Sequence, residues 1–129
     1  MSFKKIIQSK KAPSPIGPYS QAVIANGILY ASGMIAINPE TGDLDIGNIE
    51  NESKRVMDNI GHVLSAAGVS YEHIIKCSIF LSDMNNFAKV NEVYGSYFIS
   101  DPPARETVEV ARLPKNVNVE ISIIAQVER

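Results

Sequence analysis

The sequence predicts an α+β fold in which a six-stranded mixed sheet carries two helices on one face. Three features of the 129-residue chain support this prediction: alternating apolar residues near the C-terminus, two stretches with a helical apolar stripe, and turn residues between the segments. The expected order is β-β-β-α-β-α-β-β, and without repeats or linkers we expect one domain over residues 1–129. Two helices can cover one face of such a sheet, but not both.

Three strands are expected in the first part of the chain. A short strand at Phe3–Gln8 ends in a stiff loop at Pro13, Pro15, Gly17 and Pro18. A second strand, Tyr19–Ile24, leads into Asn26-Gly27, a strong two-residue signal for a β-hairpin. Residues Ile28–Ile37 are nearly all apolar, which is typical of a central strand covered on both faces.

Two helices are expected in the middle of the chain. Asn48 can cap the first helix, and Gly68 stands where a glycine commonly follows a helix end. The apolar residues between them recur with the helical period: Val56, Met57, Ile60, Val63, Leu64 and Ala67. A buried strand is expected at Ile74–Leu81. The second helix is expected from about Asn85 to Phe98, because Pro102 prevents its continuation. Its inward-facing residues are expected to be Phe87, Val90, Tyr94, Tyr97 and Phe98.

Two alternating runs near the C-terminus predict a β-hairpin. They cover residues 105–110 and 117–127, and the Pro-bearing link between them reads as the turn. Matching the apolar faces sets the expected pairs: Val108 with Val119, Val110 with Val117, Thr107 with Glu120, and Arg105 with Ser122. In this register Arg105 and Glu120 are diagonal neighbours on one polar face.

Arg105 and Glu120 are therefore the candidate functional pair. The planar fork of an arginine matches a carboxylate in a bidentate manner, and a nearby glutamate can hold a water molecule or move a proton. Together they would suit a small anionic substrate that needs proton transfer. The alternative, a surface ion pair worth about 0–1 kcal/mol, stays open on spacing alone.

Composition excludes several other classes of function. The formal net charge of −2 gives no field that would attract nucleic acid or an anionic membrane. No run approaches the length of about 20 apolar residues that a membrane span needs. Cys77 is the single cysteine, so no intrachain disulfide can form, which suits a cytoplasmic protein. His62 and His73 have no partners at metal-ligand spacing, and we expect no metal site.

The sheet face without helices predicts self-association. That face is expected to include apolar side chains such as Ile124 beside the polar pair. A half-apolar face without helices favours burial against other subunits.

Four segments resemble the Rid/YjgF family of reactive-intermediate deaminases. They are GPYSQA (17–22), ASGMIAINPETG (31–42), FAKVNEVYGSYF (87–98) and PARETVEVARLPKNVNVEISIIA (103–125). The resemblance covers essentially the whole chain. It implies a chorismate-mutase-like (YjgF) fold, a homotrimer with three sites in the clefts between subunits, and a deaminase that needs no cofactor.

The resemblance also implies a reaction and the residues for it. Family members hydrolyse 2-enamine and 2-imine acids, such as 2-iminobutanoate and 2-iminopropanoate, to 2-keto acids and ammonia. Arg105 would hold the substrate carboxylate, and Glu120 would position the attacking water. The remaining positions that match site-lining residues are Tyr19, Ser32, Asn91 and Gly33, the last offering a backbone N–H.

The chain departs from the family pattern at two places. Thr107 stands where some active members have a cysteine, and Ile99–Pro103 is a short connection. Thr107 is expected to line the substrate site and to change its shape. The short connection is expected to change the pocket rim, and so which imine fits.

Two other functions remain as alternatives. The first is a non-catalytic trimer that binds small ligands, or a chaperone-like regulator, using the same cleft. The second is an RNA-directed activity, which has been described for some relatives. The sequence does not favour RNA binding, because it has no basic stripe and no tryptophan.

Overall fold

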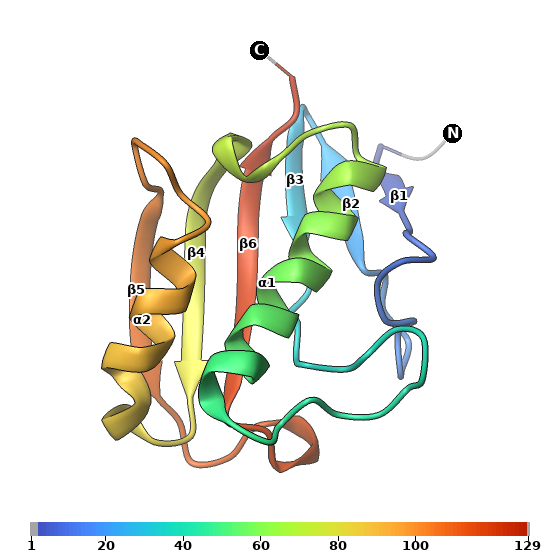
Figure 1. Cartoon of the computed structure of the whole chain (residues 1–129). Coiled ribbons are helices and arrows are strands. Elements are labelled where there is room, and N and C mark those ends of the chain that lie inside the picture. The colour runs from blue at the N-terminus through green and yellow to red at the C-terminus, as the bar shows by residue number, and fades with distance from the viewer. Residues whose placement is uncertain (1–2, 129) are drawn as a thin grey trace.

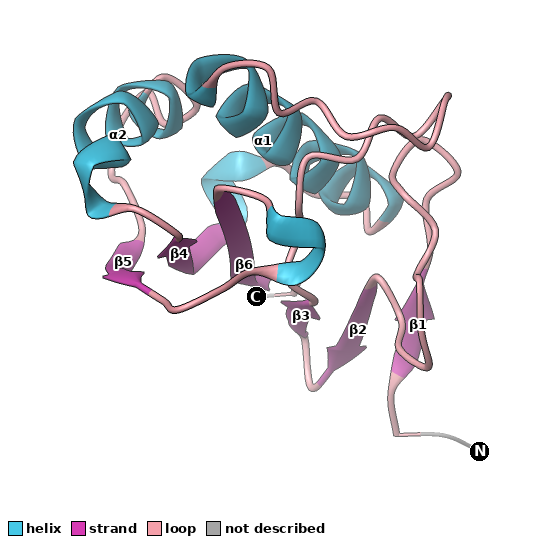
Figure 2. Ribbon diagram, turned by 90° about the horizontal axis from the view of Figure 1, so that it is seen from below, coloured by secondary structure: helices cyan, strands magenta, loops and turns pink. Residues whose placement is uncertain are grey.

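The computed structural model describes residues 3–128. Within them the chain forms a six-stranded sheet in the order β1-β2-β3-β6-β4-β5, with both helices on one face (Figures 1 and 2). The elements are β1 Lys5–Ile7, β2 Ala22–Ala25, β3 Ile28–Ala31, α1 Ile49–Ala66, β4 Ile74–Leu81, α2 Phe87–Gly95, β5 Ala104–Glu109 and β6 Val119–Gln126. Only β4 and β5 run parallel among these pairs, so the sheet is mixed. The predicted α+β architecture and element order are confirmed.

Helix α1 begins and ends where its sequence signals place it. The Asn48 side chain accepts a hydrogen bond from the Asn51 N–H at 2.8 Å, and Gly68 adopts a φ of +79° after the last turn. The apolar stripe faces the sheet, and its members are buried: Val56, Met57, Ile60, Val63 and Leu64. They pack on Leu29, Ile79 and Ile121 from the sheet to form the main core.

Helix α2 is shorter than predicted at both ends. The Asp83 side chain accepts from the Asn85 N–H at 2.9 Å, which starts a separate 3₁₀ turn before Phe87. At the other end, the Ser96 hydroxyl donates to the Val93 carbonyl at 2.6 Å, where the regular helix stops. The helix nevertheless buries Val90 and Tyr94, as expected of its inward face.

The first three strands are also shorter than predicted, although their order holds. Tyr19 lies in the loop before β2 rather than in the strand. Asn26 and Gly27 both have positive φ angles, of 52° and 76°, as a tight two-residue hairpin turn requires. β3 ends at Ala31, after which the chain meets β6 only through a bridge between Met34 and Ile121.

The prediction that Ile28–Ile37 is covered on both faces is wrong for the single chain. Tyr30 points away from the helices and is 48% exposed. The apolar run reflects two different environments. Leu29 lies in the main core, whereas Ile35 packs with Leu113 and Val117 in a second, smaller apolar cluster.

The predicted C-terminal hairpin is wrong. Strands β5 and β6 do not pair with each other, because β4 lies between them (Figure 1). β5 pairs with β4 in parallel and β6 pairs with β4 in antiparallel orientation. The link between β5 and β6 is not a tight turn, since it buries Leu113 and Val117 in the second apolar cluster.

This change of partner separates the two candidate residues. Arg105 lies beside Cys77 of β4, and Glu120 lies beside Phe80. Positions 77 and 80 are an odd number of residues apart on one strand, so their side chains point to opposite faces. Arg105 therefore lies on the helix-covered face and Glu120 on the open face, and the predicted diagonal contact does not exist.

Candidate functional site

A pocket of about 300 Å³ lies beside Glu120. It is lined by Pro13, Ser14, Ile16, Tyr19, Gln21, Ser32, Gly33, Met34, Ile35, Ile37, Pro114 and Glu120. We call it the Glu120 pocket. Four of the predicted site residues, Tyr19, Ser32, Gly33 and Glu120, meet in it, although they come from the loop before β2, the segment after β3, and β6.

Burial raises the pKa of the Glu120 carboxyl above its ordinary value. A carboxylate whose pKa is raised is a stronger base, which suits it to accepting a proton from water. Its side chain lies against the backbone at Gly33, where a Cβ atom would overlap the Glu120 carboxylate. Glycine at position 33 thus leaves the space that the carboxylate occupies.

Tyr19 and Ser32 supply hydroxyls to the same pocket. The Ser32 hydroxyl donates to the Ser20 carbonyl at 2.7 Å, which fixes its orientation. The Tyr19 hydroxyl accepts a hydrogen bond from the Ile16 N–H at 3.3 Å. Tyr19 is 47% exposed and contributes to the lining of the same pocket.

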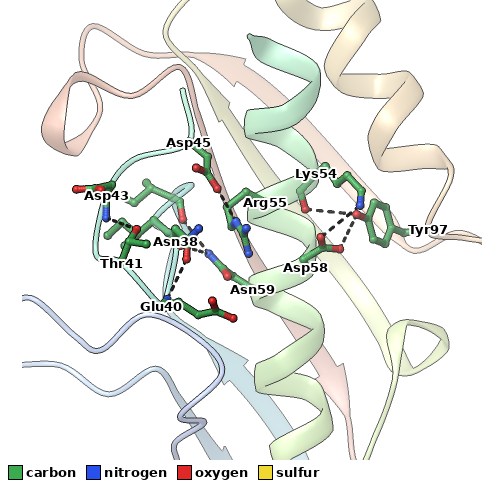
Figure 3. A network of polar contacts seen from close by, with 12 residues as sticks. Asn38, Glu40, Thr41, Asp43, Asp45, Lys54, Arg55, Asp58, Asn59 and Tyr97 are labelled. Atoms are coloured by element: carbon green, nitrogen blue, oxygen red, sulfur yellow. Dashed lines mark hydrogen bonds and ion pairs between the residues drawn. The ribbon is translucent and has the colours of Figure 1, made fainter. Parts of the chain in front are cut away.

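The far wall of the pocket is supported by α1. The buried Asn59 side chain donates to the Ile37 carbonyl at 2.9 Å, directly behind the apolar wall of Ile35 and Ile37. The Arg55 Nε donates to the Asp45 carboxylate at 2.7 Å (Figure 3). This ion pair holds the loop that follows Ile37 to the same helix. These contacts fix the position of the wall without entering the pocket.

Arg105 belongs to a second group of residues, on the helix-covered face. Its Nη1 donates to Asn91 Oδ1 at 2.6 Å. Its guanidinium carbon lies 5.1 Å from the centre of the Tyr94 ring and 5.6 Å from that of Phe87. All three partners come from α2, and contacts of a cation with aromatic faces are favourable. They orient the guanidinium, and we call these four residues the Arg105 group.

Phe87 and Tyr94 were not predicted as site residues. Sequence analysis assigned them only to the inward face of the second helix. The sequence signal for their role is their spacing around Asn91, because residues three and four apart share one helix face. This signal can be used only once it is known that this face of the helix lies over β5.

Thr107 lies two residues beyond Arg105, on the same side of β5. Its hydroxyl oxygen is buried and has no hydrogen-bond partner within the described residues. The Tyr94 hydroxyl lies against the Cys77 thiol. Burial raises the pKa of the nearby Cys77 thiol, which disfavours the nucleophilic thiolate. Cys77 is fully buried and packs as a core residue.

The predicted residues thus form two groups rather than one. Tyr19, Ser32, Gly33 and Glu120 line the Glu120 pocket, whereas Asn91, Arg105 and Thr107 lie on the other face of the sheet. The Arg105 group can bind a carboxylate, and the Glu120 pocket can bind a small molecule and transfer a proton. Within one chain they do not share a cleft.

Two further features are absent from the described residues, 3–128. No group of three or more His, Cys, Asp or Glu side chains there is placed to hold a metal ion. Over the same residues, no helix has the length and apolar character needed to cross a membrane.

Comparisons with known proteins identify the family. A family model described as Endoribonuclease L-PSP matches residues 9–127. The solved structure of the Rid family protein YyfA from Yersinia pestis is 52% identical, with 96% of this chain and 99% of that chain covered and a TM-score of 0.94. The Bos taurus protein named 2-iminobutanoate/2-iminopropanoate deaminase is 45% identical, with 95% of this chain and 89% of the relative covered.

A third relative was solved with a ligand. The structure of E. coli TdcF with bound serine is 39% identical and has a TM-score of 0.91, with 95% of this chain and 98% of that chain covered. These matches extend over nearly the full length of both partners, as the resemblance of the four sequence segments implied. The chain therefore belongs to the Rid/YjgF/RutC (endoribonuclease L-PSP) family and has its YjgF-like fold.

Proposed function

We propose that this protein is an imine deaminase that hydrolyses 2-iminobutanoate, 2-iminopropanoate and their enamine forms to 2-keto acids and ammonia. The observation that carries the proposal is the combination of an oriented guanidinium at Arg105 with a pocketed carboxyl at Glu120 whose pKa is raised. The Bos taurus relative, named for this activity, supports the same reaction.

The chemistry requires one binding step and two proton transfers. Arg105 binds the substrate carboxylate, and the enamine tautomerises to the imine. Glu120 accepts a proton from water as the oxygen attacks C2 and the C=N π bond opens, and it returns that proton to the nitrogen to give a carbinolamine. Glu120 then moves the hydroxyl proton of the carbinolamine to the amino group, so that the C–N bond breaks, the carbonyl forms and ammonia leaves. Free imines hydrolyse without help, so orientation and a positioned acid–base group, worth about 10²–10⁴-fold, are sufficient.

The proposed site forms between subunits. The Arg105 group and the Glu120 pocket lie on opposite faces of the sheet in one chain, so one substrate can contact both only if two copies contribute. A contact between two different surfaces of identical chains is head-to-tail, and it closes into a ring when the rotation permits. A homotrimer with three interfacial sites satisfies this requirement, and the exposed Tyr30 and Val108 on the open face supply apolar surface to bury.

A trapping assay tests the proposal. An amino-acid oxidase generates the imine, semicarbazide traps it, and an active deaminase lowers the amount trapped. Arg105→Ala is expected to abolish the effect, because the substrate carboxylate then has no cation to bind. Arg112→Ala, at an exposed arginine outside both groups, is the matched control and is expected to stay active. An active Arg105→Ala protein would refute the assignment.

A ligand-binding protein without catalysis is the second candidate, favoured by the E. coli relative with bound serine. It predicts that wild type binds 2-ketobutyrate in calorimetry but never lowers trapping of any imine tested. The family description also names a ribonuclease, but a formal charge of −2 offers little attraction for RNA. Cleavage of RNA by the pure protein, lost in Arg105→Ala, would favour that activity instead.

A further inference from the structure

The loop before β2 is held by a buried side chain, Gln21. This glutamine is 3% exposed. Its Nε2 donates to the Pro13 carbonyl at 2.8 Å, to the Ser9 carbonyl at 3.1 Å and, at 3.4 Å, to that of Ala12. Its Oε1 accepts from the Ser9 N–H at 2.6 Å. The single amide group thus satisfies four backbone groups of the loop.

Within residues 3–128, the side-chain hydrogen bonds that connect residues 9–13 to the rest of the chain all involve Gln21. The other side-chain bond of this segment is local, from the Lys11 N–H to the Ser9 hydroxyl. A glutamate could not replace the glutamine, because it lacks the N–H donors and would bury a charge beside three carbonyl oxygens.

The same residue connects the loop to the Glu120 pocket. Its backbone carbonyl accepts from the Ser32 N–H at 2.9 Å, next to Gly33. The loop that its side chain holds contributes Pro13, Ser14 and Ile16 to the pocket lining, and Tyr19 follows directly. Gln21 therefore joins the loop wall of the pocket to the wall formed by the segment after β3.

We propose that Gln21 is a positioning residue that holds residues 9–18 as one wall of the Glu120 pocket and so sets substrate affinity. Its effect on the KM for the imine rests on the proposed deaminase function, whereas its effect on the loop does not. Gln21→Met keeps a similar side-chain volume but removes all four hydrogen bonds.

Proteolysis measures the loop directly. Lys10 and Lys11 are exposed within the held segment, and trypsin cleaves after them only when the loop opens. Gln21→Met is expected to raise the rate of cleavage at these two sites about tenfold, followed by mass spectrometry. The matched control is Tyr71→Phe, which removes the hydrogen bond to the Met57 carbonyl at 2.6 Å, far along the chain from the loop. Equal cleavage in Gln21→Met and wild type would overturn the proposal.

Hydrogen exchange tests the same contact without a mutation. The Ser9 amide bonds Gln21 Oε1, whereas the neighbouring Lys10 amide has no hydrogen bond within the described residues. In the wild-type protein the Ser9 amide is expected to exchange at least about tenfold more slowly than that of Lys10. Equal exchange at the two amides would also overturn the proposal.

Ligand measurements separate positioning from a purely structural role. For Gln21→Met we expect the KM for 2-iminobutanoate and the Kd for 2-ketobutyrate to rise about tenfold, with kcat changing less, because the reacting groups remain while the wall is lost. An unchanged KM and Kd together with faster cleavage would make Gln21 structural only. If wild type fails to hydrolyse imines, the proposed function fails, and the Kd and proteolysis still decide the role of Gln21.

Discussion

Gly33 is the residue whose size decides where Glu120 can lie. A Cβ atom at this position would overlap the Glu120 carboxylate, and the backbone there does not need a positive φ. Gly33→Ala is therefore expected to fold but to displace the carboxylate from the pocket, lowering kcat/KM for 2-iminobutanoate at least about tenfold. Gly47→Ala, where a Cβ meets nothing within 4 Å, should retain activity. Full activity in Gly33→Ala would mean that Glu120 need not occupy this position.

The raised pKa of Glu120 predicts a pH dependence of stability. The folded pKa lies above the ordinary 4.5, so the folded state binds the proton more tightly than the unfolded chain does. This contribution to stability is complete below the unfolded pKa and is lost as the pH rises through the folded pKa. Thermal unfolding of wild type and Glu120→Gln should be compared from below the unfolded pKa to above the folded pKa. Over this range wild type should lose stability relative to the variant as the pH rises. A Tm difference between the two proteins that does not change with pH would contradict the raised pKa of Glu120.

The arginine illustrates how neighbouring side chains prepare a residue for binding. The guanidinium of Arg105 already has Asn91 and two aromatic rings as neighbours before any ligand is bound. Such orientation reduces the entropy that binding would otherwise cost. Sequence reasoning found Arg105 and Asn91, but it found the aromatic partners only as core residues, because a helix pattern does not say which strand lies below it.

At the scale of elements, α1 and β6 are joined by a buried carboxylate. Glu52 is fully buried in the first turns of α1 and accepts hydrogen bonds from the Asn118 N–H at 2.8 Å, the Asn118 Nδ2 at 2.7 Å and the Val119 N–H at 3.1 Å. These residues immediately precede Glu120. The contact fixes the start of the strand that carries the proposed catalytic carboxylate.

Removing this carboxylate should destabilise the fold. Glu52→Ala leaves buried N–H groups without acceptors, and we expect a loss of about 2–4 kcal/mol in the free energy of unfolding, measured by urea denaturation. Glu50→Ala, at an exposed acidic residue in the first turn of the same helix, is the control and should change it by less than about 0.5 kcal/mol. Equal stabilities for the two variants would show that the buried contacts contribute little.

The helices and strands differ in how far the sequence predicts them. The cap at Asn48 and the glycine at 68 depend on contacts within a few residues, so α1 was predicted nearly to its ends. The pairing partner of β5 was not predicted correctly, because every strand offers the same backbone donors and acceptors to a neighbour. β4 lies between β5 and β6 and uses both of its edges, which local alternation cannot reveal.

At the scale of the whole molecule, the opposite placement of Arg105 and Glu120 predicts complementation between inactive subunits. Arg105→Ala and Glu120→Gln are each expected to be inactive alone. When the two proteins are co-expressed or refolded together in equal amounts, about one quarter of the interfacial sites should combine both native residues and regain activity. Light scattering should give about three times the chain mass of 14.1 kDa. A site built within one chain would regain no activity on mixing.

The sequence by itself determined the order of elements, the helix ends with local caps, the face on which each β6 side chain lies and, through the four matching segments, the family. Only the tertiary structure decided which strands are neighbours, and hence that Arg105 and Glu120 point to opposite faces. The physical reason lies in what each pattern encodes. Alternation reports which face of a strand is buried, whereas the choice of partner depends on backbone groups and on the packing of the whole core.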